Sequence, residues 1–309
     1  MDSYPSLLNL IGNTPLVQLP LNVPPTVLGK MEYLNPGGSL KDRSALYMIE
    51  EAERKGHLTR GGTIVEASSG NQGIALAMIG AIKGYKVIIT VPERTSAEKV
   101  ETLRAYGAET LVCKDTDELE DPEGYHSVAE RIFEELRAEN RPCFMPNQYF
   151  NPSNPQAHYR STGPEVWEQT SGQVTHFVCG TGSCGTVTGV ARYLKEKNEN
   201  IQVIGVDSMH SAFSSSAPES YNVEGIGIDV VSDTLDLSVI DKIIPISDED
   251  AFQMTRTMAK QGILVGISSG AVIHVAETLA QSLSPDDLVV TILGDSGRAY
   301  LSKVFGVSS

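Results

Sequence analysis

Lys41 lies in the segment NPGGSLKDR, residues 35–43, where its neighbours suggest a chemical role. Ser39 and Asp42 have the spacing of a capping box, which places Lys41 in the first turn of a helix. The positive end of the helix dipole disfavours an ammonium there, so we expect the pKa of Lys41 to fall below its usual value of about 10.4. A neutral lysine amine forms a Schiff base with an aldehyde. The alternative is an ordinary surface lysine, with Arg43 paired to a nearby acid.

Three further loops rich in glycine and serine each stand at a predicted helix start. They are EASSGNQG (66–73), GTGSCG (180–185) and GISSG (266–270). Backbone N–H groups at a helix start bind anions, although in any one loop these residues can equally serve only as a cap. Together the loops indicate a ligand with several acceptor groups. Pyridoxal phosphate combines an aldehyde, a phosphate, an aromatic ring and a phenolate, and is the ligand for which a lysine and such loops would be needed.

The elements that carry these loops alternate along the chain. Apolar runs typical of strands lie at 63–67, 86–91, 110–113, 176–179, 203–207 and 288–293, and helical periodicity follows at 44–55, 74–82, 186–198 and from 271. Thr95 and Glu98 predict a capping box for a further helix that Gly107 ends. This alternation predicts an α/β fold with mostly parallel sheets, in which loops at the carboxyl ends of strands bind the ligand. Residues 208–229 form a long irregular stretch of the kind that is usually functional.

In their order, NPGGSLKDR, EASSGNQG, GTGSCGTVTG and GISSGA resemble the pyridoxal-phosphate fold-type-II (tryptophan synthase β-like) family of cysteine synthases and cystathionine β-synthases. The resemblance runs from IGNTPLVQL (11–19) to GDSGRAYLSK (294–303). It implies two three-layer α/β domains with the cofactor in the cleft between them. The smaller, mobile domain would contain residues 36–144, and the larger, cofactor-binding domain residues 1–35 and 145–309.

The resemblance also implies roles for individual residues. Lys41 would be the Schiff-base lysine and the proton shuttle, Asn71 would bond the phenolate oxygen, and Ser268 would face the ring nitrogen. The phosphate would be bound by the loop of Gly182, Ser183, Cys184, Gly185 and Thr186. The substrate carboxylate would be bound by Ser68, Ser69, Asn71 and Gln72, with Gln148 assisting.

Two residues depart from the family pattern. Gln72 puts a long amide where SSGNQG replaces the usual TSGNTG, close to the expected substrate. Cys184 replaces the second glycine of the phosphate loop, either as a small packing residue or as a redox-sensitive thiol.

Asp295 is expected to cap the helix that follows it, or else to approach the ring nitrogen.

The implied reaction is β-replacement on a serine derivative through an α-aminoacrylate intermediate. We expect a cysteine synthase that converts O-acetylserine and sulfide to cysteine and acetate. Cystathionine formation from serine or O-acetylserine and homocysteine is the alternative, and a cysteine-consuming, sulfide-releasing enzyme is a further one. Ile228 stands where cystathionine β-synthases carry an aromatic residue, and it supplies no hydroxyl to assist a poor leaving group. We expect neither the tandem regulatory modules nor the haem-binding extension of the large cystathionine synthases.

The amino-acid composition bears on which partners, metals and cellular location to expect. The 24 basic and 39 acidic residues leave a net charge of −15, which disfavours nucleic acid and anionic membranes as partners. The four cysteines and six histidines show no spacing typical of a metal site, so we expect no metal. No run reaches the roughly 18 apolar residues of a membrane span. We expect a cytoplasmic homodimer that acts on a small amino acid and a sulfide or thiol. A dehydrogenase is disfavoured because no GxGxxG follows an early strand. A catalytically silent binding protein is disfavoured because Lys41, Asn71 and Ser268 are retained.

Overall fold

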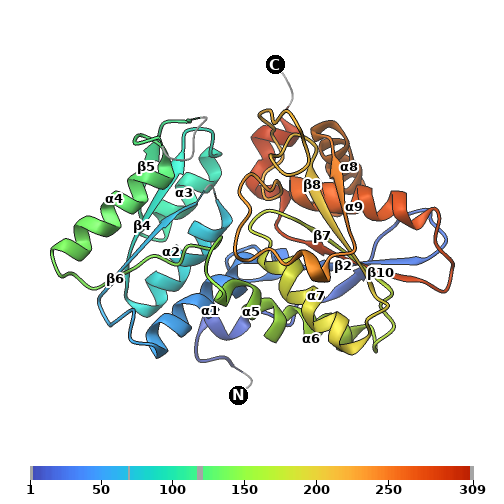
Figure 1. The fold of residues 1–309 in the computed structure, drawn as a ribbon, viewed down its shortest axis with the longest axis horizontal. Helices are drawn as coiled ribbons and strands as arrows, with labels where there is room; N and C mark the ends of the chain where they lie inside the picture. Colours follow the sequence, from blue (N-terminus) through green and yellow to red (C-terminus); the bar gives the residue numbers. More distant parts are fainter. Residues whose placement is uncertain (1–2, 69, 117–120, 307–309) are drawn as a thin grey trace. The chain divides into compact units, whose positions relative to one another are not determined.

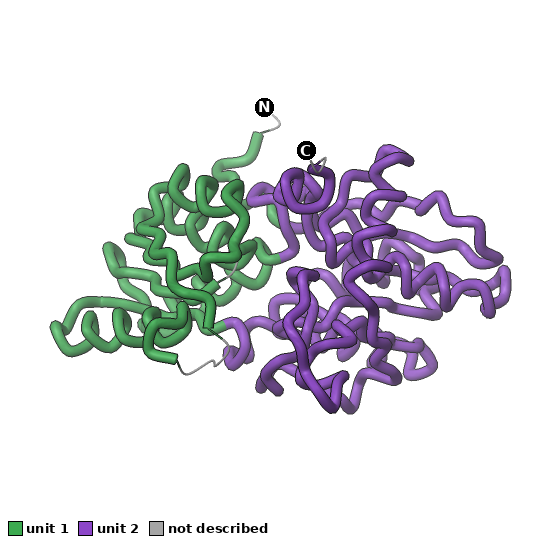
Figure 2. Tube along the Cα trace, turned by 90° about the horizontal axis from the view of Figure 1, so that it is seen from above, with its two compact units in different colours: residues 1–11, 41–147 green, residues 12–40, 148–309 purple. Residues whose placement is uncertain are grey.

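The computed structural model describes residues 3–68, 70–116 and 121–306, and the chain divides into two compact units. Unit 1 consists of Met1–Ile11 and Lys41–Asn147, and unit 2 of Gly12–Leu40 and Gln148–Ser309 (Figure 2). The expected changes of domain at residues 36 and 145 lie within a few residues of these crossings. The N-terminal segment differs from the expectation: it belongs to unit 1, because Leu8 and Ile11 pack against the core of that unit.

Unit 1 is a four-stranded parallel sheet between two helical layers, with the strand order β5-β4-β3-β6 (Figure 1). Its strands are β3 (Thr63–Ala67), β4 (Lys86–Pro92), β5 (Glu109–Cys113) and β6 (Cys143–Phe144). Its helices are α1 (Lys41–Arg54), α2 (Asn71–Lys83), α3 (Ala97–Ala105) and α4 (Tyr125–Ala138), with the short 3-10 helix η1 at Leu7–Leu10.

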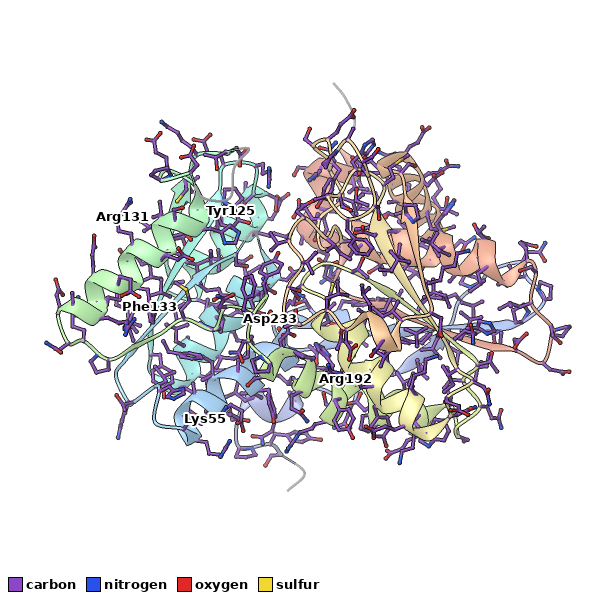
Figure 3. The ribbon with its side chains drawn as sticks, viewed as in Figure 1. Lys55, Tyr125, Arg131, Phe133, Arg192 and Asp233 are labelled. Atoms are coloured by element: carbon purple, nitrogen blue, oxygen red, sulfur yellow. The ribbon has the colours of Figure 1, made fainter. Side chains whose placement is uncertain are left out.

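Successive side chains along the strands of unit 1 pack in hydrophobic clusters on opposite faces of the sheet. Ile64 points into the cluster shared with α1 and α2, whereas Val65 points into the cluster beneath α4. Successive strand side chains face opposite sides, so a run of consecutive apolar residues is buried on both. Phe133, labelled on α4 in Figure 3, packs against the second cluster. The loops after β3 and β4 therefore project from one edge of a sheet that is covered on both faces.

Unit 2 is a six-stranded sheet with the order β1-β2-β10-β7-β8-β9, parallel except for β1. Its strands are β1 (Leu16–Gln18), β2 (Thr26–Met31), β7 (His176–Gly180), β8 (Gln202–Ser208), β9 (Lys242–Ile246) and β10 (Leu288–Leu293). Its α-helices are α5 (Ser153–Arg160), α6 (Thr162–Gln169), α7 (Gly185–Lys197), α8 (Asp248–Lys260) and α9 (Ile267–Ala280). Shorter helical turns lie at Glu32–Leu34 (η2), Leu237–Val239 (η3), Gly297–Tyr300 (η4) and Leu301–Phe305 (η5).

Two clusters cover the faces of this second sheet. Val178 and Val289 join the cluster beneath α8 and α9, whereas Phe177 and Val290 join the one beneath α7. The expected α/β fold with mostly parallel sheets is confirmed. None of the helices in the described part of the chain combines the length and apolar character that a bilayer crossing requires.

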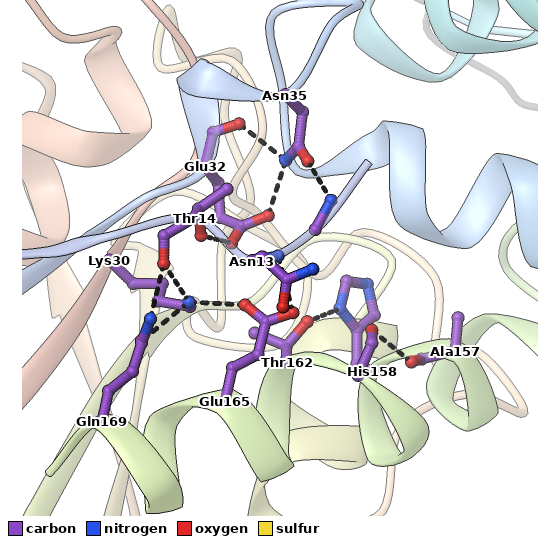
Figure 4. Close-up of polar contacts among 12 residues, drawn as sticks. Asn13, Thr14, Lys30, Glu32, Asn35, Ala157, His158, Thr162, Glu165 and Gln169 are labelled. Atoms are coloured by element: carbon purple, nitrogen blue, oxygen red, sulfur yellow. Dashed lines mark hydrogen bonds and ion pairs between the residues drawn. The ribbon is translucent and has the colours of Figure 1, made fainter. Parts of the chain in front are cut away.

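A buried polar network in unit 2 joins the segment before β1 to β2 and α6 (Figure 4). Lys30, fully buried, donates from Nζ to Thr14 O at 2.5 Å, to Glu165 Oε2 at 2.6 Å and to Gln169 Oε1 at 2.9 Å. Glu32 accepts from the Thr14 hydroxyl at 2.7 Å. The buried groups of Thr14, Lys30 and Glu32 therefore each contact a partner, as burial of polar and charged groups requires.

Several local predictions need correction. The helix predicted from a capping box at Thr95 begins at Ala97 with Ser96 as its N-cap, one residue later. The segment GISSG does not precede its helix, since α9 already begins at Ile267. Asp295 does not cap the turn that follows it, because the Ser296 hydroxyl accepts from Arg298 N–H in that role. Gly107 does follow the end of α3, with a left-handed φ of 86°.

Candidate functional site

The predicted site residues are divided between the units and are described within each. Unit 1 carries Lys41, Ser68, Asn71 and Gln72, and unit 2 carries Gln148, Ser268 and the loop from Gly182 to Thr186. Ser69 lies outside the described residues.

Lys41 is the first residue of α1, in the first turn as predicted. The residue before it, Leu40, donates its N–H to Gly294 O at 2.8 Å, and Ser39 pairs with Asp295 in an antiparallel bridge. A Cβ at Gly294 would lie 3.8 Å from the Ser268 hydroxyl. The backbone that leads into Lys41 is therefore anchored beside Ser268.

Ser68 shapes the loop between β3 and α2. Its buried Oγ accepts from Gly70 N–H at 3.3 Å and from Gly73 N–H at 3.0 Å, so it caps α2 from the preceding strand. A Cβ at Gly70 would lie 2.9 Å from Nζ of the buried Lys99, so the end of this lysine side chain lies against the turn. Helix α2 begins at Asn71, so its positive end lies at this turn, and Lys99 of α3 lies beside it.

The predicted phosphate loop lies between β7 and α7. Cys184, the N-cap of α7, adopts a left-handed φ of 59°, and its buried side chain packs in the core cluster beneath α7. Thr188 N–H bonds to Cys184 O at 3.0 Å. The amides of Gly185 to Val187 precede that bond, at the place where a helix offers N–H donors to an anion.

Two side chains from α5, Asn154 and His158, contact this loop. The Asn154 amide donates to Ser183 Oγ at 3.3 Å and to Gln148 O at 2.8 Å, which brings Gln148 and Ser183 together. The buried ring of His158 bonds through Nε2 to the Thr186 hydroxyl at 3.2 Å. Neither Asn154 nor this role of His158 was predicted, because both lie about thirty residues before their partners.

Ser268 lies in the first turn of α9, where it is half-buried. A Cβ at Gly225 would be 3.4 Å from its Oγ, and one at Gly182 would be 2.8 Å from Gly225 O. Gly225 therefore lies between the phosphate loop and Ser268, so the structure brings these two predicted features together. Gly225 lies in the irregular stretch 208–229 that the sequence marked as functional, although its contact with Ser268 was not foreseen.

Asp207, at the end of β8, orders the long loop that contains Gly225. Its fully buried carboxylate accepts from Ser211 Oγ at 2.6 Å, Ser214 Oγ at 2.5 Å and Ile228 N–H at 2.9 Å. Ile228 itself is buried in the cluster beneath α7. The position of Asp207 at the carboxyl end of a buried strand was the signal available in the sequence.

Tyr221 folds back over the same loop. Its hydroxyl donates to Asp229 Oδ2 at 2.5 Å, and the ring lies where a Cβ of Gly227 would be. Burial raises the pKa of the Tyr221 phenol, as do the hydrogen bond and charge of Asp229. The phenol therefore remains a hydrogen-bond donor at neutral pH.

These groups fit pyridoxal phosphate. The start of α7 offers amides and the Ser183 and Thr186 hydroxyls to a phosphate, Ser268 offers a neutral hydroxyl to a ring nitrogen, and Lys41 offers an amine. The described residues contain no cluster of three or more metal-ligating side chains.

Comparison with known proteins agrees with a site for pyridoxal phosphate. Residues 7–295 match the family described as "Pyridoxal-phosphate dependent enzyme". The chain is 40% identical to cysteine synthase B of Pseudomonas aeruginosa, over 97% of both chains. It is 41% identical to cystathionine β-synthase of Apis mellifera, over 97% of this chain and 61% of that protein.

A solved structure extends the similarity to three dimensions. The O-acetylserine-dependent cystathionine β-synthase of Helicobacter pylori superposes with a TM-score of 0.88 and 38% identity, over 98% of this chain and 99% of the other. The chain spans 55–61% of the length of the animal cystathionine β-synthases it matches. From its motifs, its fold and these matches, the chain belongs to the family of pyridoxal-phosphate dependent enzymes.

Proposed function

We propose that this protein catalyses β-replacement on O-acetylserine, in which the sulfur of sulfide or of a thiol replaces acetate. When bound, pyridoxal phosphate supplies the electron sink that weakens the Cα–H bond and lets the β-substituent leave. The observation that carries the proposal is the anchoring of Leu40 on Gly294, which sets the backbone just before α1 beside Ser268. The proximity of Gly225 to both Gly182 and Ser268 supports the same assignment within unit 2.

Each predicted residue receives a role in this scheme. The Lys41 amine would hold the cofactor, remove the α-proton and later return one. The neutral Ser268 hydroxyl would leave the ring nitrogen unprotonated, which favours departure of a β-substituent. The start of α7 would bind the phosphate, and Asn71 the phenolate oxygen. The start of α2, with Ser68 and Gln72, would bind the substrate carboxylate.

The leaving group decides between O-acetylserine and serine as the first substrate. Ile228 is buried in the core and supplies no hydroxyl, so we expect an acetate leaving group to be favoured over hydroxide. The sequence ranks sulfide first as the acceptor, which makes the product cysteine. Homocysteine as the acceptor, giving cystathionine, is the second candidate, and the 41% identity to cystathionine β-synthase of Apis mellifera favours it.

Borohydride reduction of the holoenzyme followed by peptide mapping tests the covalent attachment. We expect a pyridoxyl group on the peptide that contains Lys41, and Lys41→Ala should lose this label together with about 10²–10⁴-fold of the turnover rate. Lys55→Ala is the matched control, because Lys55 is an exposed lysine just beyond the same helix (Figure 3). A label on another lysine, or full turnover by Lys41→Ala, would contradict the proposal.

A further inference from the structure

Asp295 and Tyr300 form a buried hydrogen-bonded pair just after β10. The exposed fractions of the two residues are 2% and 1%, and the Tyr300 hydroxyl donates to Asp295 Oδ2 at 2.6 Å. The tyrosine also packs in the cluster beneath α8 and α9. Burial of a carboxylate is costly even where hydrogen bonds compensate for it, so a buried carboxylate at this place favours a functional role.

The pair lies against the glycine that precedes Ser268 by two residues. A Cβ at Gly266 would coincide with Asp295 Oδ1 and would lie 2.8 Å from Cε2 of Tyr300, so both side chains fill the place of the missing Cβ. The Gly266 N–H also donates to Asp295 O at 3.0 Å. Because Gly266 is the N-cap of α9, the carboxylate lies at the positive end of that helix, where an anion is stabilised.

The residues on either side of this carboxylate contact the same turn of α9. The Gly294 N–H donates to the Ser269 hydroxyl at 3.0 Å, and a Cβ at Gly294 would lie 3.8 Å from Ser268 Oγ. Ser296 pairs with Val265 in an antiparallel bridge. Three consecutive residues after β10 therefore fix the backbone both before and after Ser268.

Two roles for Asp295 were open from the sequence, as a helix cap or as a group that approaches the ring nitrogen. The cap is provided by the Ser296 hydroxyl. The Asp295 carboxylate instead contacts the start of α9 at Gly266, and the proposed partner of the ring nitrogen, Ser268, lies in the first turn of that helix. The arrangement favours the second role in an indirect form, in which the carboxylate acts through Ser268.

We propose that Asp295, oriented by Tyr300, is a positioning residue that directs the Ser268 hydroxyl toward the ring nitrogen of pyridoxal phosphate. This inference rests on the role proposed above for Ser268. The first N–H groups of a helix have no partner within it, so contacts from outside the helix are needed to fix its first turn. A hydrogen bond weakens steeply when its geometry is lost, which makes the support of Ser268 important.

Cofactor binding by the full chain, freed of its cofactor and reconstituted, tests this role without turnover. The two probes are pyridoxal phosphate and its 1-deaza analogue, in which a C–H group replaces the ring nitrogen while the aldehyde, hydroxyl and phosphate are kept. We expect the unaltered protein to bind pyridoxal phosphate about tenfold more tightly than the analogue, because one hydrogen bond is lost. Ser268→Ala should abolish this preference.

Asp295→Asn keeps the shape of the side chain and removes the charge that the start of α9 stabilises. We expect it to lower the preference to about threefold or less, and Tyr300→Phe to lower it in the same direction. In the Ser268→Ala background neither substitution should change the preference further, since the contact that both support is already lost. Tyr85→Phe is the matched control: its hydroxyl donates to Glu53 at 2.7 Å, beyond the C-terminal end of α2, and this variant should keep the full preference.

The preference between the two probes, rather than either affinity, is decisive. A preference unchanged within twofold in Asp295→Asn overturns the inference, since an equal fall in both affinities shows a purely structural role. If Asp295→Asn does not fold, Tyr300→Phe is judged by the same criterion. A preference that is absent from the unaltered protein, or that survives Ser268→Ala, overturns the role of Ser268 and this inference with it. Absence of turnover with O-acetylserine overturns the proposed β-replacement alone, because the binding measurement contains no substrate.

Discussion

At the residue scale, Cys184 shows how backbone conformation restricts the side chain in the predicted phosphate loop. Its φ of 59° is one that glycine adopts without strain, whereas a side chain with a Cβ is disfavoured there. The resemblance places a glycine at this position, and the conformation supplies the reason. The thiol is retained in a buried place within the cluster beneath α7, where it packs as a small apolar group.

We therefore expect opposite tolerances for two substitutions of Cys184. Cys184→Gly relieves the backbone while losing some packing, so the free energy of unfolding should change by less than about 1 kcal/mol. Cys184→Val should lower it by about 2 kcal/mol, because a β-branched side chain is a severe outlier at positive φ. Denaturant unfolding measures both, and a stable Val variant would argue against a left-handed residue here.

At the element scale, the connection from β8 to β9 is ordered by the buried carboxylate of Asp207, together with Asp229 and Asp248. Residues 209–236 are all described and contain neither a helix nor a strand. Throughout these described residues, the connection has no helical or strand hydrogen bonds of its own. Asp207 orders it instead by accepting hydrogen bonds from Ser211, Ser214 and Ile228. The Gly225 segment, which lies against the phosphate loop and Ser268, is positioned by this arrangement.

Asp207→Asn should release this connection while leaving the sheet in place. Asparagine replaces one carboxylate oxygen by an NH₂ group, which cannot accept from the two serine hydroxyls that bond Asp207 Oδ2, so we expect a loss of about 2–4 kcal/mol in the free energy of unfolding. Limited proteolysis should cut faster within residues 209–229. Asp241→Asn, an exposed carboxylate at the start of β9, is the control, and equal cutting of the two variants would exclude the proposed role.

At the scale of the whole molecule, the chain passes between its two units after residues 11, 40 and 147. Each unit has its own sheet and its own apolar clusters. Segment Gly12–Leu40 belongs to unit 2 because β2 pairs with β10 in its sheet and because Lys30 bonds to Glu165 of α6. The hydrogen bonds of Lys30 with Thr14, Glu165 and Gln169 thus connect this N-terminal segment to a unit whose other residues come after position 147.

Lys30→Met should weaken unit 2 selectively. It leaves the Glu165 carboxylate, 15% exposed, without its cation, which we expect to cost about 3–5 kcal/mol. Hydrogen exchange should accelerate in β2 and α6, whereas amides of β3 and β4 in unit 1 should keep their protection. Uniform acceleration across both units would show that the two cores unfold together.

Local sequence determined the elements and the identity of the motifs. Strands β3, β4, β5, β7, β8 and β10 were predicted to within two residues, because buried parallel strands are continuous apolar runs. Strands β1, β2, β6 and β9 were missed, being very short or interrupted by Gly29 and Pro245. Lys41 at a helix start followed from local spacing, and the cofactor followed from the ordered motifs.

Only the tertiary structure decided which distant groups meet. Lys30 finds Glu165 and Gln169 at separations of 135 and 139 residues, and Gly225 meets Ser268 through a loop without periodicity. It also decided that Gln72 is buried with its amide unused, whereas the sequence showed only an unusual residue. Periodicity and capping act over a few neighbouring residues, whereas the pairing of buried polar groups depends on how separate elements pack, which no short stretch of sequence encodes.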